Sequence, residues 1–373
     1  MKKATLLFLI LIIGGSVSAQ FRETQNVIIV TLDGSRWQEI YRGADSSLIN
    51  SKYTKDKEEV RENFWAETVE ERRKLLMPFM WSTMVRGGQL YGNRDIGNKS
   101  EVANKAGSSY PGYNEIFTGA PDWKIMGNAP INNTNKSVLE YINKQPGFEN
   151  EVVVFASWEL FPYIFNVKQS GLKVNAGYTD VAETDANGHI KYLNELQHTI
   201  PHPIGETRVD TMTYELGKAY LKQYKPRIMY FAFDETDEMG HRGNYQSYLN
   251  KLRQQDGFIK ELWLYIQTDS TYRNKTTLII TCDHGRGDAS PWAWTEHSIL
   301  IKNSIQTWMA VIGPDTPAEG EMGTSTTIYQ KQIAQTIAKL LGFDFKANTK
   351  RAIGDPIESI TRKDVIVNVA KKQ

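Results

Sequence analysis

Three apolar runs rich in β-branched residues each stop directly before an aspartate, and this arrangement constrains the fold most strongly. The runs are residues 26–32, 227–233 and 276–282, and they lead into Asp33-Gly34, Asp234 and Asp283-His284-Gly285. Short, continuous apolar runs are typical of strands buried on both faces of a parallel sheet. Ligands in open α/β sheets bind at the carboxyl ends of the strands, so the polar residues at these junctions are expected to converge.

Strands and helices alternate along the rest of the chain, without a linker or repeat. The further expected strands are residues 151–157 and 307–312, and the expected helices are residues 137–144, 207–224, 245–268 and 329–341. The charged stretch 66–85 predicts an amphipathic helix lying on the sheet. The polar stretch 169–203 has no clear period, which indicates either a small insertion over the mouth of the site or a surface loop. The expected fold is an α/β three-layer sandwich with a central, mostly parallel sheet and a small insertion near the site.

Residues 1–19 have the pattern of a secretory signal peptide. Lys2 and Lys3 form a basic head, residues 6–13 are apolar, and Val17 and Ala19 occupy the small positions before a cleavage site. An uncleaved membrane anchor is the alternative. No cysteine follows the apolar stretch, which excludes a lipoprotein anchor there. We therefore expect a periplasmic or secreted protein without a membrane anchor after cleavage, folded over residues 20–373.

Composition excludes some classes of partner and chemistry. Lys and Arg total 44 against 43 Asp and Glu, without a long basic run, so binding to a nucleic-acid backbone is not expected. The single cysteine, Cys282, rules out disulfides within the chain. Strand alternation directs Cys282 away from the side of Asp283, which favours a buried packing thiol over a nucleophile. The sequence does not indicate an oligomeric state.

Several histidines and aspartates have the spacing of metal ligands. Asp237 and His241 lie four residues apart, which puts both side chains on one face of a helical turn. Asp283 and His284 can reach one ion where a strand ends and the chain turns at the following glycine. His297 lies among aromatic residues. Read singly, each has an ordinary alternative, such as a capping aspartate, a surface histidine or a packed core histidine. Together they indicate a metal centre.

The order of these motifs resembles the alkaline phosphatase superfamily. The shared pattern is strand-Asp-Gly at Asp33, Asp-x-x-x-His at Asp237, Asp-His-Gly at Asp283 and a later His297, and it extends to a terminal helix-like segment at 328–342. Ser109-Tyr-Pro, followed by Ile-Phe-Thr-Gly at 116–119, resembles the nucleophile segment of the nucleotide pyrophosphatase/phosphodiesterase branch. That branch usually has Thr-Phe-Pro there, so the serine leaves the preference between monoesters and diesters open.

The resemblance implies a site with two divalent metal ions and a serine nucleophile. The first ion would be held by Asp237, His241 and His297, and the second by Asp33, Asp283, His284 and the Ser109 oxygen. Such a mixture of carboxylate and imidazole ligands suits zinc best, with manganese or iron as alternatives. Asn128 is a candidate oxyanion donor. Trp158 is a candidate for stacking on a flat group, and a rim or core tryptophan is its alternative.

The implied function is that of an exported phosphoester hydrolase, phosphodiesterase-like, that acts on a small phosphorylated substrate through a phosphoserine. A phosphomonoesterase of the same superfamily is the main alternative. A transferase of the phosphoglycerate mutase type would need a large second domain, and a phosphoethanolamine transferase would need several membrane helices. A sulfatase would need arginine four positions after the nucleophile, where this chain has Tyr113.

Overall fold

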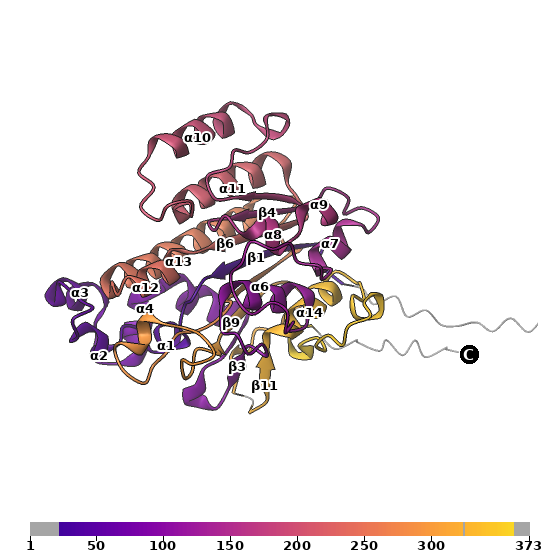
Figure 1. Ribbon diagram of the computed structural model, residues 1–373. Helices are drawn as coiled ribbons and strands as arrows, with labels where there is room; N and C mark the ends of the chain where they lie inside the picture. The colour runs from indigo at the N-terminus through magenta and orange to yellow at the C-terminus, as the bar shows by residue number, and fades with distance from the viewer. Residues whose placement is uncertain (1–21, 324, 362–373) are drawn as a thin grey trace, which may run out of the picture.

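The core of the molecule is one eight-stranded sheet, seen in the computed structural model that describes residues 22–323 and 325–361 (Figure 1). Its strand order is β10-β2-β9-β7-β1-β6-β4-β5. The strands are β1 (Asn26–Leu32), β2 (Gln89–Tyr91), β4 (Val152–Ala156), β5 (Lys173–Ala176), β6 (Ile228–Phe233), β7 (Thr276–Thr281), β9 (Met309–Ile312) and β10 (Gly320–Glu321). β9 runs antiparallel to β2 and β7, and the other pairs are parallel. The predicted signal peptide at 1–19 lies outside the described residues.

The three expected junctions meet at the centre of this sheet. β1 lies between β6 and β7 and is parallel to both. Leu32 pairs with Phe233, and Thr31 pairs with Thr281, so the three strands end at nearly the same level. The aspartates that follow these strands therefore lie side by side at one edge, as the sequence predicted.

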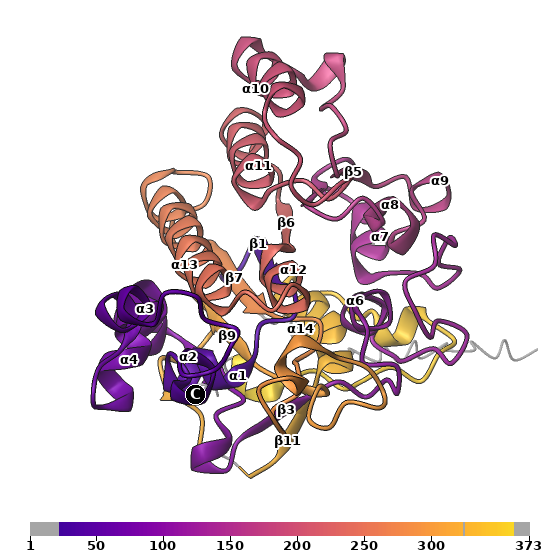
Figure 2. The same ribbon diagram turned by 60° about the vertical axis from the view of Figure 1, so that its left-hand side comes forward.

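Both faces of the sheet are covered by helices, which makes the predicted three layers (Figure 2). Along β1, Ile28 and Val30 pack into one hydrophobic cluster, and Val27 and Ile29 pack into the other. The first cluster includes α1 (Trp37–Arg42), α2 (Ser46–Ile49), α3 (Lys57–Phe64), α4 (Val69–Leu76), α11 (Asp210–Tyr224), α12 (Glu235–His241) and α13 (Tyr245–Thr268). The second includes α6 (Ser109–Thr118), α7 (Val138–Asn143), α8 (Phe161–Ile164) and α14 (Ile333–Leu340). Burial on both faces explains why the central strands have continuous apolar sequences.

A small second sheet lies beside the main one, in the order β11-β3-β8. Its strands are β3 (Lys99–Glu101), β8 (Gln306–Thr307) and β11 (Thr327–Tyr329). The predicted strand at 307–312 is therefore divided between two sheets, because β8 pairs with β3 while β9 pairs with β7 and β2.

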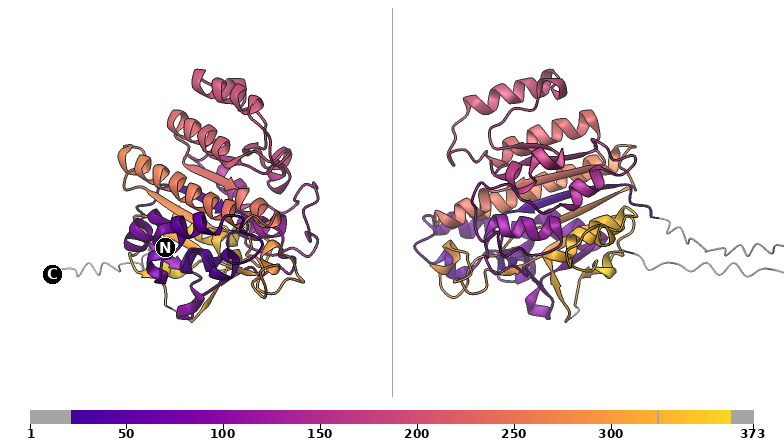
Figure 3. Two further views of the ribbon diagram at one scale, coloured as in Figure 1. Left: turned by 90° about the vertical axis from the view of Figure 1, so that its left-hand side faces the viewer. Right: turned by 45° about the vertical axis from the view of Figure 1, so that its right-hand side comes forward.

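The polar stretch 169–203 is more ordered than a surface loop. It holds the end of α9 (Val167–Ser170), the edge strand β5, and the helix α10 (Gly188–Thr199). α10 starts where the Asn187 side chain accepts a hydrogen bond from Ile190 N, and it packs on α11 at the outside of the molecule (Figure 3). The segment after α10 reaches the neighbourhood of the site, because Arg242 donates to Pro203 O at 2.7 Å. The surface-loop alternative is therefore wrong. The sequence shows no clear period here because a short polar edge strand leaves little periodic signal.

The expectation of a single helix over residues 66–85 is also wrong. α4 ends at Leu76, and a π-helical turn (Met80–Met84) and the short α5 (Val85–Gly87) follow. Pro78 causes the break, because proline disfavours the helical conformation in the residue before it, and Met77 has φ −130° and ψ 72°. Within residues 22–323 and 325–361, none of the helices combines the length and apolar character needed to cross a membrane.

Candidate metal centre and active site

The predicted metal ligands gather in two adjoining groups at the carboxyl ends of β1, β6 and β7. We call Asp237, His241 and His297 the first group, and Asp33, Asp283, His284 and the Ser109 hydroxyl the second group. Asp33 and Asp283 follow β1 and β7, Asp237 and His241 lie on α12, and His297 lies in the loop after the 3-10 turn Ala293–Thr295. Ser109 is the first residue of α6.

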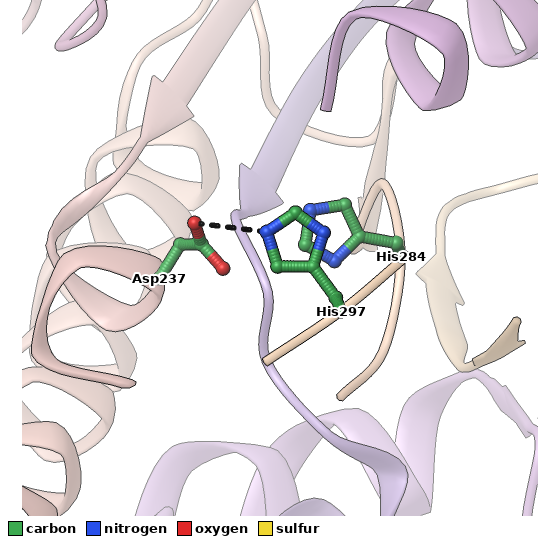
Figure 4. A group of neighbouring side chains, drawn as sticks. All are labelled: Asp237, His284 and His297. Carbon is green, nitrogen blue, oxygen red and sulfur yellow. Dashed lines mark ion pairs between the residues drawn. The ribbon is translucent and has the colours of Figure 1, made fainter. Parts of the chain in front are cut away.

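The three side chains of the first group point their ligand atoms at one another. Asp237 Oδ2 lies 3.0 Å from His241 Nε2 and 3.6 Å from His297 Nε2, and the two Nε2 atoms are 2.9 Å apart. Figure 4 shows Asp237 facing His297. Ligand atoms on a tetrahedral zinc ion are separated by about 3.3 Å, given metal–nitrogen distances of about 2.0–2.1 Å. The spacing therefore fits three ligands of one ion.

The second group contains buried oxygen atoms that lack partners. His284 Nε2 lies 3.3 Å from Asp283 Oδ2, 3.5 Å from Asp33 Oδ1 and 3.2 Å from Ser109 Oγ. Among the described residues, Asp33 Oδ1 and Asp283 Oδ2 are buried and accept no hydrogen bond. Burying a carboxylate oxygen without a partner is costly, so these two atoms fit a cation between them.

Hydrogen bonds fix the rings of His297 and His284 in the form that a metal requires. His297 Nδ1 lies 2.7 Å from Gly107 O, and His284 Nδ1 lies 2.9 Å from Gly285 O. A carbonyl oxygen only accepts, so each Nδ1 carries the proton and each Nε2 presents a lone pair to the site. The two rings stack with centroids 3.8 Å apart, which joins the two groups (Figure 4). His284 also offers a ligand atom within 4.8 Å of ligand atoms of Asp237 and His297, so this side chain is within reach of both positions.

The carboxylates of the two groups differ in their electrostatics. Burial and the charge of Asp237 raise the pKa of Asp283 to about 7, and burial and Asp283 raise the pKa of Asp33 well above its ordinary value. Burial alone would also raise the pKa of Asp237, but Arg286, His297 and His241 hold that pKa well below its ordinary value. Burial lowers the pKa of His284, which keeps this ring neutral as a metal ligand must be.

Ser109 lies beside the second group, at the N-terminus of α6. It is 5% exposed and starts α6, where the partial positive charge of the helix N-terminus favours an ionised oxygen. Asn128 is held beside it, because Asn128 Oδ1 accepts a hydrogen bond from Tyr110 N at 3.0 Å. This bond uses the carbonyl oxygen of Asn128 and leaves its amide NH₂ group to meet an anion. A cavity of about 470 Å³ adjoins this point, lined among others by Tyr110, Ile125, Met126, Asn128 and Ile131.

Two residues that the sequence patterns did not assign to the site contact its carboxylates. Tyr113 donates from its hydroxyl to Asp33 Oδ2 at 2.8 Å. Arg286 donates to Asp237 Oδ1 and forms an ion pair with it. The only signals in the sequence are that Tyr113 lies one helical turn after Ser109 and that Arg286 follows the Asp-His-Gly motif.

Three other residues close to the site in sequence or space have structural roles. Arg36, close to Asp33 in sequence, pairs with Glu39. Trp158 is half-buried and packs edge-on against Phe161, with ring centroids 6.4 Å apart. Cys282 is completely buried, as expected of a packing thiol.

Several solved structures share this fold at low sequence identity. The wild-type alkaline phosphatase PafA aligns with a TM-score of 0.60 and 10% identity, over 91% of this chain and 99% of that one. The lipoteichoic acid synthase LtaP from Listeria monocytogenes aligns at 0.54 and 11% identity, over 91% and 75%. The phosphonate monoester hydrolase of Agrobacterium radiobacter aligns at 0.51 and 11% identity, over 85% and 74%. No curated protein matches the sequence.

A family model identifies the chain more directly. The model described as the metalloenzyme superfamily matches residues 120–344, which is more than half of the chain. This range contains the whole first group together with Asp283 and His284. Divalent metal binding, predicted from the ligand pattern, agrees with this family. The chain belongs to the metalloenzyme superfamily, with the fold of the alkaline phosphatases.

Proposed function

We propose that this protein is a two-metal phosphoester hydrolase that acts through a phosphoserine on Ser109. The observation that carries the proposal is the position of Ser109 Oγ, 3.2 Å from His284 Nε2 within the second group and at the N-terminus of α6. We assign the first ion to Asp237, His241 and His297, and the second to Asp33, Asp283, His284 and Ser109. The mixed nitrogen and oxygen ligands favour zinc over manganese or iron.

The proposed reaction has two in-line displacements at phosphorus. In the first, the Ser109 oxygen loses its proton to solvent and forms a bond to phosphorus, while the bond to the leaving oxygen breaks. In the second, water attacks the phosphoserine, the bond between phosphorus and Ser109 breaks, and phosphate or its ester leaves. When bound, the two divalent ions supply positive charge that favours the ionised nucleophile and the leaving oxygen. The Asn128 amide donates to a non-bridging oxygen of the substrate.

Ser109 and its neighbour Ser108 provide a matched pair of variants. Ser108 is the N-cap residue of α6 and makes no capping hydrogen bond with its side chain. We expect Ser109→Ala to lower kcat on the order of a thousandfold or more and to leave the metal content near normal. Ser108→Ala should change kcat only slightly. Acid quenching during turnover should trap one phosphoryl group on the peptide that contains Ser109. Trapping on another residue, or full activity of Ser109→Ala, would refute the assignment.

We further propose a preference for phosphodiesters over monoesters. Tyr110, not arginine, follows Ser109, so a guanidinium that would grip two oxygens of a phosphate dianion is missing at that position. The cavity beside Tyr110 and Asn128 offers space for the organic group of a diester. Values of kcat/KM for a nitrophenyl phosphodiester, nitrophenyl phosphate and nitrophenyl sulfate decide the matter, because this ratio reports transition-state discrimination. We expect the diester to be at least as good as the monoester and the sulfate to be far behind; a clear preference for the monoester favours the phosphatase alternative.

We also propose that residues 20–373 act as one exported unit in the periplasm or outside the cell. The signal-like pattern of residues 1–19 supports this location. Cell fractionation, together with the N-terminal sequence of the mature protein, is the test. A mature chain that starts at Gln20 is expected, and a cytoplasmic chain with residues 1–19 intact would contradict the proposal.

A further inference from the structure

Arg286 places a buried positive charge beside the first group. Its side chain is 1% exposed, and its guanidinium donates to Asp237 Oδ1. It also donates to three backbone carbonyls, Trp294 O at 2.7 Å, Thr295 O at 2.5 Å and Asp237 O at 3.3 Å. Arg286 Nη2 lies 3.4 Å from His241 Nδ1. Asp237 therefore keeps Oδ2 turned toward the imidazoles of the first group, while Arg286 holds Oδ1.

The surrounding chain is built to admit this guanidinium. A Cβ atom added at Gly240 would come within 2.4 Å of Arg286 Cζ. One added at Gly34 would lie 2.2 Å from Asp237 Oδ1 and 3.0 Å from Arg286 Nη1. The carbonyls of Trp294 and Thr295 belong to the segment that leads into His297. Arg286 thus joins α12, the end of β1 and the loop that carries His297, so it is a positioning residue for the first group.

The second group has two carboxyl groups and, among the described residues, no arginine or lysine partner. Asp33 and Asp283 both contribute carboxylates, and each has one buried oxygen that accepts no hydrogen bond from a described residue. The hydrogen bonds that these carboxylates do accept come from neutral donors, Tyr113 Oη and Gly34 N. A cation placed between these two oxygens would favour the ionised form of both carboxylates, whereas Arg286 already balances the single carboxylate of the first group.

We infer that the two metal positions fill in a fixed order, the second group first and tightly, the first group last and more weakly. A divalent ion in the first group gains one carboxylate oxygen whose charge Arg286 already shares, and it is repelled by that guanidinium. An ion in the second group gains two carboxylates that no arginine or lysine of the described residues pairs, and it displaces the protons that they hold. Arg286 sets the difference in affinity while it holds Asp237 and the His297 loop in place. This inference rests on metal binding and does not depend on which ester the protein hydrolyses.

The test is a zinc titration of the metal-free full chain by calorimetry with a competing chelator. We expect two binding events that differ in Kd by about tenfold or more, because like charges this close repel strongly even when partly screened. Asp283→Asn should remove the tighter event, and His297→Ala should remove the weaker one. Equal affinities in the wild-type protein, or loss of the tighter event in His297→Ala, would overturn the proposed order.

Two substitutions at Arg286 separate its charge from its shape. Arg286→Gln removes the charge and keeps a hydrogen-bond donor. The weaker zinc-binding event should therefore become tighter, and the difference in Kd between the two events should narrow. Arg286→Lys keeps the charge and loses the planar fork, so the gap should persist. Circular dichroism of each metal-free variant confirms that it is folded. An unchanged or wider gap in folded Arg286→Gln would show that the charge does not set the order. Phosphodiesterase activity is not needed for any of these readings.

Discussion

Removing the metal is expected to make the stability of the protein fall as the pH rises, because of one buried carboxyl group. Burial and Asp237 raise the pKa of Asp283 to about 7 in the metal-free protein, whereas an unfolded aspartate has a pKa of about 3.9. The folded state therefore holds this proton more tightly than the unfolded state. The resulting stabilisation is fully present below about pH 4 and is lost as the pH rises through 7.

The magnitude follows from the separation of the two pKa values. The difference is roughly three pH units, and each unit is worth about 1.4 kcal/mol, so Asp283 accounts for about 4 kcal/mol in total. Between pH 5 and pH 7 the metal-free protein should lose about 2 kcal/mol of unfolding free energy from this group. Burial also raises the pKa of Asp33 well above its ordinary value, which acts in the same direction. A bound cation keeps both carboxylates ionised and removes this dependence.

Urea unfolding of metal-free and zinc-saturated protein at pH 5, 6, 7 and 8 measures the effect. Burial raises the pKa of Asp210 to about 6 and of Asp256 to about 7, but neither residue is in the two groups, so their contributions cancel in the comparison. The gap between the two forms should widen with pH, and metal-free Asp283→Asn should lack most of the excess slope. Parallel loss of stability in both forms, or an unchanged slope in Asp283→Asn, would refute the reasoning.

Three further substitutions test single contacts. Tyr113→Phe removes the donor to Asp33 and should weaken the tighter zinc event about tenfold or more, with little loss of stability in the zinc-saturated protein; an unchanged Kd would contradict the role of this hydroxyl. Gly240→Ala forces a methyl group against Arg286 and should lower the unfolding free energy by about 1–3 kcal/mol in urea, whereas wild-type stability would mean that the guanidinium moves freely. Ile131→Asp should raise KM for the nitrophenyl phosphodiester more than for nitrophenyl phosphate, and equal effects would place the organic group elsewhere.

The centre of the fold could be predicted because its strands are buried on both faces. β1, β6 and β7 have uninterrupted apolar sequences, and each stops at an aspartate, so the sequence carries both the strand and its end. The edge of the sheet has no such signal. β5 is half-buried at Lys173 and Val174, and four residues are too few to show a period. α10 and β5 therefore required the tertiary structure to be recognised, and so did the break at Pro78.

The convergence of the candidate ligands was predictable to the same extent, for a related reason. Metal ligands are restricted to a few residue types, and their spacing follows from the strand ends and from one helical turn, so each ligand leaves a local mark. The residues that orient the ligands do not. Tyr113 meets Asp33 across 80 positions of the chain, and Arg286 meets Asp237 across 49.

Either residue would look ordinary in the sequence, since a tyrosine in an apolar helix and an arginine after a glycine have many structural uses. What identifies Arg286 is the space reserved for it. Gly34 and Gly240 lie on different elements, and a side chain at either would collide with the Asp237–Arg286 pair. The Asp237–Arg286 pair can pack in this position only because both neighbouring residues lack a Cβ atom. The charge beside Asp237 is therefore part of how the first group is built, and any account of metal affinity in this protein has to include it.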